Sequence, residues 1–123
     1  MGPGSRFVIV REFRVNAGCE RDFELVFGPG GVWAVLVQTR SEGYLRTELQ
    51  TASLADRSFR IFDIWQSHWD FEAFRESYQD DVEQFRRWLA NKDLVDHETL
   101  VGSFYTDEAD EADGSEDAGL VEA

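Results

Sequence analysis

The sequence is poor in the residues that mark export, membrane insertion and metal binding. Its 123 residues include one cysteine, two prolines and two histidines. A single cysteine, Cys19, cannot form an internal disulfide, so nothing suggests export and we expect a cytoplasmic protein. The longest apolar run, Val32 to Val37, is far too short to span a bilayer, and we expect no membrane partner. Two histidines without cysteine or carboxylate at ligand spacing give no metal signature.

Basic residues are also scarce, and much of the acidic excess lies at one end. The chain has 12 Lys and Arg residues against 25 Asp and Glu residues, a formal net charge of −13. Without a basic stripe, nucleic-acid binding is disfavoured. No GxGxxG loop follows a strand, so no nucleotide cofactor is expected. Composition predicts a tag-like or disordered segment over residues 1–5, one domain over 6–105 and an acidic, disordered tail over 106–123.

The spacing of apolar residues predicts four strands and three helical segments. Side chains alternate with period two in the strands, at residues 6–15, 44–51, 58–66 and 98–105. Helical spacing predicts helices over residues 19–27, 32–39 and 68–90. The breaker Gly28-Pro29-Gly30-Gly31 divides the first two helices. Ser67 is the expected N-cap of the third helix, with Asp70 three residues on in a capping-box arrangement.

This order of elements is β-α-β-β-α-β, with the first helix split in two. It is the ferredoxin-like arrangement, an α+β fold with a four-stranded antiparallel sheet whose first and third strands are central. Those two strands carry large apolar groups on both faces. Helices can cover only one face of such a sheet, so a second copy of the chain is expected to cover the other. We therefore expect a homodimer that forms through the sheet faces, a dimeric α+β barrel.

Two charged residues interrupt the apolar faces of the central strands. Asp63 shares a strand face with Trp65, and Arg11 lies on the strand expected to be its neighbour. A buried carboxylate needs a partner, so we predict a bidentate Arg11–Asp63 ion pair. The pair could fix the sheet or the dimer interface, or it could orient a bound phenol or carbonyl.

An ordered set of short motifs over residues 6–105 resembles the antibiotic biosynthesis monooxygenase (ABM) domain of the dimeric α+β barrel superfamily. The resemblance implies a pocket between sheet and helices, lined by Trp65, and oxidation of phenolic or quinol substrates without a cofactor. Heme-degrading relatives carry an Asn on the first strand and a heme-ligand His on the long helix. This chain has Arg11 in the approximate place of the Asn and no His between Trp69 and Asn91, so heme degradation is disfavoured. The motifs are Asp63-Ile64-Trp65-Gln66-Ser67, Phe71 with Phe74, Gly43-Tyr44-Leu45 and Glu98-x-x-x-Gly102-x-Phe104.

The resulting prediction is a cofactor-independent monooxygenase for a small aromatic or polyketide-like substrate. The alternative is a non-catalytic dimeric module that binds a hydrophobic small molecule or serves in stress, with heme degradation third. His68 could be a general base or an exposed first-turn residue, and the aromatic residues could form a pocket wall or a core. An open cavity that reaches Trp65 and holds a polar group would favour the enzyme over the module. The predicted catalytic residues are His68, Tyr78 and Trp65, and the predicted substrate-binding residues are Arg11, Asp63, Trp33, Phe27 and Phe74.

Overall fold

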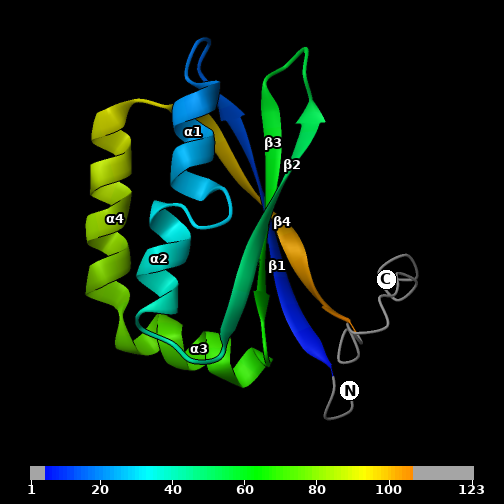
Figure 1. The fold of residues 1–123 in the computed structure, drawn as a ribbon, viewed down its shortest axis with the longest axis vertical. Helices are drawn as coiled ribbons and strands as arrows, with labels where there is room; N and C mark the ends of the chain where they lie inside the picture. The colour runs from blue at the N-terminus through cyan, green and yellow to red at the C-terminus, as the bar shows by residue number, and fades with distance from the viewer. Residues whose placement is uncertain (1–4, 107–123) are drawn as a thin grey trace.

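The computed structural model of the chain describes residues 5–106, which form four strands and four helices (Figure 1). The strands and the helical character of each predicted segment are confirmed, with shifts at the ends. None of the described helices is long and apolar enough to cross a membrane. The elements in chain order are β1 Arg6–Val15, α1 Glu20–Phe27, α2 Val32–Gln38, β2 Tyr44–Ser53, β3 Ser58–Trp65, α3 His68–Ser77, α4 Gln79–Lys92 and β4 Val95–Thr106.

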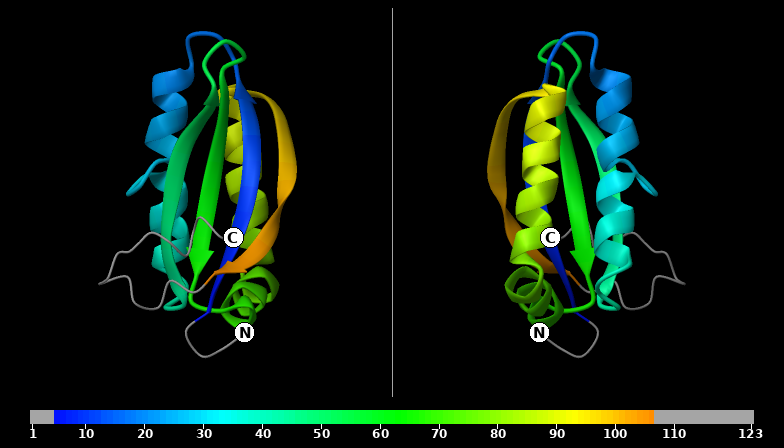
Figure 2. Two further views of the ribbon diagram at one scale, coloured as in Figure 1. Left: turned by 90° about the vertical axis from the view of Figure 1, so that its right-hand side faces the viewer. Right: turned by 90° about the vertical axis from the view of Figure 1, so that its left-hand side faces the viewer.

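The four strands form one antiparallel sheet in the order β2-β3-β1-β4. The first and third strands are therefore central, as the sequence predicts, and the fold is the predicted ferredoxin-like α+β arrangement. All four helices pack on one face of this sheet, and Figure 2 shows that face and the opposite one. The side chains that alternate along β1 and β3 consequently point either toward the helices or toward the outer face.

The helix-facing side of the sheet carries an aromatic core. Rings of Phe13, Phe23 and Phe27 lie 4.8 to 5.3 Å apart, centroid to centroid, in tilted arrangements. Tilted and edge-on ring pairs add to the free energy of burial, by about 0.5–1.5 kcal/mol each. The outer face carries a second apolar cluster, so the two-faced pattern of β1 and β3 is confirmed. Its members are Val8, Val10 and Ile64, with Phe62 and Phe104 packed against them.

The predicted single helix over residues 68–90 is wrong, because the chain turns at Tyr78. This residue has φ −123° and ψ 34°, and it separates α3 from α4. Phe74 before the turn and Phe85 after it are both buried, so the apolar spacing continues across the turn. The spacing of apolar residues alone therefore cannot predict the turn. The predicted cap is confirmed, since the Asp70 N–H donates to Ser67 Oγ at 3.1 Å and Ser67 Oγ donates to Asp70 Oδ2 at 2.8 Å.

A bulge near the start of β2 changes which of its side chains face the helices. Tyr44 pairs with Trp65 and Arg46 pairs with Ile64, which leaves Leu45 as the extra residue. Strict alternation predicts Tyr44 and Thr47 on opposite faces, and this prediction is wrong. The bulge puts both on the helix-facing side.

A second bulge, in β4, lies beside Arg11. Val10 pairs with Gly102 and Arg11 pairs with Leu100, so Val101 is the extra residue. Strand β4 ends at Thr106, one residue beyond the predicted domain end, and Thr106 is buried. The predicted start over 1–5 and the rest of the predicted tail lie outside the described residues, apart from Ser5.

Candidate active site

The site is built around Asp63, a buried carboxylate on central strand β3. Its Oδ1 accepts hydrogen bonds from Thr47 Oγ1 at 2.6 Å and from the Trp33 indole N–H at 3.1 Å. Its Oδ2 accepts from Arg11 Nη2 at 3.1 Å. The side chain of Asp63 is only 6% exposed, so this set of donors replaces the water that an ionised carboxylate needs.

The predicted Arg11–Asp63 ion pair is present, but it is not bidentate. Only Nη2 of Arg11 contacts Asp63, while Nη1 contacts Glu98 Oε2 at 3.5 Å. The Trp33 indole and the Thr47 hydroxyl occupy the positions on Asp63 that a second guanidinium N–H would otherwise take. Arg11 is thereby shared between two acids.

Tyr44, a buried member of the helix-facing core, extends the same network. Its hydroxyl lies 2.5 Å from Thr47 Oγ1. Because the Thr47 proton points to Asp63, Thr47 Oγ1 must accept from Tyr44. Burial, helped by the negative charge of Asp63, raises the pKa of Tyr44 to about 12. Tyr44 therefore stays protonated and donates throughout the physiological range.

Arg11 is held as a fixed cation. Its guanidinium carbon lies 5.1 Å from the centroid of the Trp33 ring and 5.7 Å from that of Phe27. Its side chain is 12% exposed. Aromatic faces attract a cation, and Asp63 fixes its direction, so the guanidinium is oriented before any ligand arrives.

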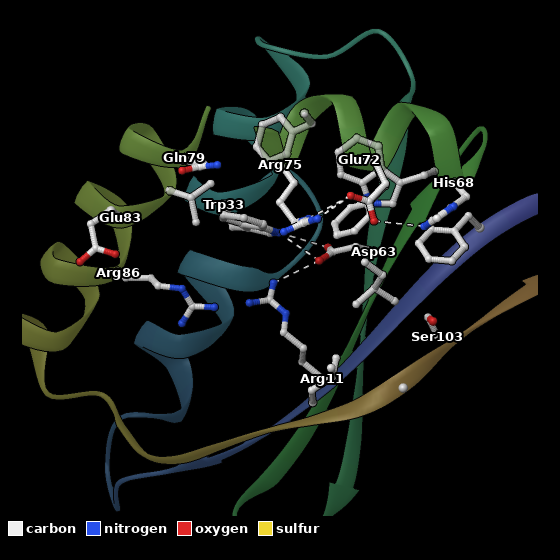
Figure 3. A pocket seen from close by; sticks show the side chains of 18 residues that line it. Arg11, Trp33, Asp63, His68, Glu72, Arg75, Gln79, Glu83, Arg86 and Ser103 are labelled. Atoms are coloured by element: carbon white, nitrogen blue, oxygen red, sulfur yellow. Dashed lines mark hydrogen bonds and ion pairs between the residues drawn. The ribbon is translucent and has the colours of Figure 1, made fainter. Parts of the chain in front are cut away.

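An open pocket of about 520 Å³ lies between the sheet and helices α3 and α4 (Figure 3). Its size is within the range of small-molecule sites, and mostly apolar walls with a few polar groups are what such sites have. The β4 bulge turns Leu100, Gly102 and Ser103 toward it. The aromatic lining residues are Phe7, Trp33, Trp65, Phe71 and Phe74, with His68 at the rim.

His68 begins α3 and belongs to a polar cluster on the pocket rim. Its Nε2 lies 3.1 Å from Glu72 Oε2, one helical turn away. Arg75 Nη2 donates to Glu72 Oε1 at 2.6 Å, and this hydrogen bond lowers the pKa of the Glu72 carboxyl. An ionised carboxylate only accepts, so a neutral His68 ring donates from Nε2 and keeps its lone pair on Nδ1. Its ring centroid lies 4.6 Å from that of Phe7.

The pocket brings together most of the predicted site residues, but not all of them. Two of the predicted residues do not line it. Phe27 is fully buried in the aromatic core, and Tyr78 lies at the α3–α4 turn with its ring 5.5 Å from that of Phe74. Those that line the pocket are Arg11, Trp33, Asp63, Trp65, His68 and Phe74.

Several polar residues of the site were not predicted. Thr47 was not predicted because the bulge at Leu45 places its side chain on the opposite face from the one that strict alternation gives. The sequence does contain a signal for Glu72, because it lies four residues after His68 and such a spacing puts two side chains on the same helix face. Arg86 and Glu83 enter the pocket from α4, whose direction depends on the unpredicted turn before it.

Trp65 contributes an indole with an unpaired donor. It is 2% exposed, and its Nε1 has no hydrogen-bond partner among the described residues. The rings of Tyr44 and Phe71 stand edge-on to it at 5.5 Å. Within residues 5–106, no group of three or more His, Cys, Asp or Glu side chains is placed to hold a metal ion.

The element order and the sheet order are those of a fold shared with solved structures of ABM-type monooxygenases. No known family model matches the chain, and no curated protein matches it by sequence. Solved structures match the chain in fold. A point variant of SnoaB, a cofactor-independent oxygenase from Streptomyces nogalater, is 20% identical with a TM-score of 0.54, over 80% of this chain and 90% of that one.

Two further solved structures give the same result. A proposed antibiotic biosynthesis monooxygenase from Bordetella bronchiseptica is 18% identical, with a TM-score of 0.53 over 82% of this chain and 94% of that one. A Shewanella oneidensis protein is 18% identical, with a TM-score of 0.56 over 83% and 91%. The resemblance seen in the sequence is thus confirmed as a shared fold.

Proposed function

We propose that the protein is a monooxygenase that oxidises a small aromatic substrate without a metal or organic cofactor. The observation that carries the proposal is the pocket itself, which joins aromatic walls to a fixed, half-buried cation, Arg11, and a histidine at the rim. The fold, shared with a cofactor-independent oxygenase, supports the same reading. An open cavity that reaches Trp65 and holds polar groups favours an enzyme over a solidly packed, non-catalytic module.

The reaction that fits these groups is the oxidation of a phenol or anthrone to a quinone. Loss of a proton makes the substrate an electron-rich anion, which gives electrons to dioxygen. A new carbon–oxygen bond then forms at the ring carbon, and the resulting hydroperoxide loses water. The balance is one substrate and one O2 in, one quinone and one water out, with two hydrogens removed from the substrate. The substrate itself supplies all the electrons.

Each pocket group has a role in this proposal. The guanidinium of Arg11 stabilises the negative charge of the bound substrate, which is the electrostatic part of catalysis. His68 Nδ1 accepts the substrate proton, and Glu72 holds the ring in the tautomer that leaves Nδ1 free. Trp33 and Trp65 hold the aromatic substrate and keep water from the reacting carbon.

We also propose that the active form is a homodimer joined through the outer sheet faces. The outer cluster, Val8, Val10, Phe62, Ile64 and Phe104, supports this proposal because it lies opposite the helices. Two further apolar side chains are exposed at the bulges, Leu45 at 38% and Val101 at 47%. An apolar sheet face of this kind is typical of a surface that packs on another layer.

The two histidines provide a matched test of the proposed chemistry. Oxygen uptake by chelator-treated protein is measured with anthrone and polycyclic phenols as substrates. His68→Asn should lower kcat/KM by about 100-fold, the usual contribution of a general base. His97→Asn should leave it unchanged, because His97 is exposed on β4 and does not line the pocket. Equal losses in the two variants, or no uptake by the unaltered protein with any of these substrates, would refute the proposal.

A further inference from the structure

We propose that the ligand of the pocket is an aromatic acid, whose carboxylate is bound by Arg11 and Arg86. This inference rests on the proposed function for the identity of the site, and it adds the chemical class of the substrate. Both arginines line the pocket. They come from different elements, β1 and α4, and meet at one end of it.

The two guanidinium groups already share one carboxylate. Glu98 Oε2 lies 3.5 Å from Arg11 Nη1, and Glu98 Oε1 lies 3.3 Å from Arg86 Nη1. Both distances exceed the roughly 2.7–2.9 Å of a good charge-assisted hydrogen bond. The pair is therefore arranged for a carboxylate and only loosely occupied by one.

Glu98 does not line the pocket, so the arginines face it with donors that Glu98 does not use. A guanidinium has five N–H donors. Arg11 directs one to Asp63 and one to Glu98. Asp63 and the Trp33 ring hold Arg11 in place, so it meets an incoming oxyanion without losing conformational freedom.

Asp63 pairs with Arg11 itself, and the two glutamates that line the pocket are each paired with another base. Glu72 accepts from Arg75 at 2.6 Å, and Glu83 lies 3.6 Å from Arg87. Their charges are thus balanced locally and oppose a bound anion less than free carboxylates would.

The layout of the pocket gives the ligand an orientation. Figure 3 shows Arg86 and His68 at opposite ends, with Trp33 between them. A carboxylate on Arg11 and Arg86 places the aromatic rings against Trp33 and directs the far ring toward His68. The proposed base then meets the end of the substrate that is remote from its acid group.

The test compares 2-naphthoate with 2-naphthamide, which has the same shape and no charge. Binding is measured by titration calorimetry at pH 7.5 on the unaltered protein and three variants. Naphthoate should bind about ten-fold tighter than the amide, the value of one good charged hydrogen bond. Arg86→Gln should lower this preference, because only Arg11 then remains to bind the carboxylate. Arg40→Gln is the matched control and should preserve it, because Arg40 pairs with Asp81 and neither residue lines the pocket.

Glu98→Gln should act in the opposite direction. It removes a competing negative charge, so naphthoate should bind about three-fold tighter while the amide is unaffected. Equal affinity for acid and amide, no binding of either, equal losses in the two arginine variants, or weaker acid binding by Glu98→Gln would each overturn the inference. Oxygen uptake with uncharged phenols is scored separately. Oxidation without acid preference defeats this inference alone, and acid preference without oxidation defeats only the proposed function.

Discussion

Replacement of Asp63 by Asn should destabilise the fold far more than the loss of one surface charge. Three donors, from Thr47, Trp33 and Arg11, point at this carboxylate. An amide offers one oxygen in place of two and turns an N–H₂ group toward donors. Breaking a buried ion pair from one side costs about 3–5 kcal/mol. Because Arg11 keeps a contact with Glu98 at 3.5 Å, we expect a loss near the lower limit, about 3 kcal/mol.

The matched control is Asp96→Asn on strand β4. Asp96 forms an ion pair with Arg14 at 3.0 Å, with half of both side chains exposed. Exposed pairs contribute about 0.2–1 kcal/mol, so this variant should unfold almost like the unaltered protein. The assay is urea unfolding followed by tryptophan fluorescence and circular dichroism. A loss of 3 kcal/mol shifts the midpoint by roughly 1–3 M. Equal midpoints for Asp63→Asn and Asp96→Asn would refute the account of the Asp63 network.

Three further predictions concern other parts of the fold. Tyr44→Phe should remove an absorbance step at 295 nm centred at about pH 12. Since the folded pKa is raised, the stability from this hydroxyl is complete below pH 10 and disappears as the pH rises toward 12. The prediction is contradicted if the step that the substitution removes is centred near pH 10. Ser67→Ala should lose the cap on the Asp70 N–H and about 1 kcal/mol in urea unfolding, whereas Ser77→Ala, at an exposed position of α3, should stay within about 0.5 kcal/mol. Phe62→Glu should give a folded monomer in sedimentation, and an unchanged mass would argue against the proposed interface.

The general arrangement could be predicted from the sequence because it depends on residue periodicity. Phe59, Ile61 and Trp65 alternate along β3 and lie in the core, as expected. Asp63 lies on the same face, and the need of a buried carboxylate for a partner predicts its pairing with Arg11, which the structure confirms. These inferences need only the alternation of side chains and the cost of burying a charge.

The details of the site depend on irregularities that periodicity does not reveal. The extra residue Leu45 brings Thr47 onto the face of Asp63, and no feature of the sequence marks that bulge. The turn at Tyr78 preserves the apolar spacing on both sides, so α3 and α4 look like one helix. The direction of α4, and with it the place of Arg86, follows only from that turn.

The central claim is that the pocket oxygenates an aromatic substrate with dioxygen and no added cofactor. Its most direct test is mass spectrometry of the product formed by chelator-treated protein under ¹⁸O₂, with anthrone as substrate. The account predicts a quinone that carries one ¹⁸O atom, formed in the absence of added metal, flavin or heme. No product, label taken from water, or turnover only after one of these groups is added would contradict it.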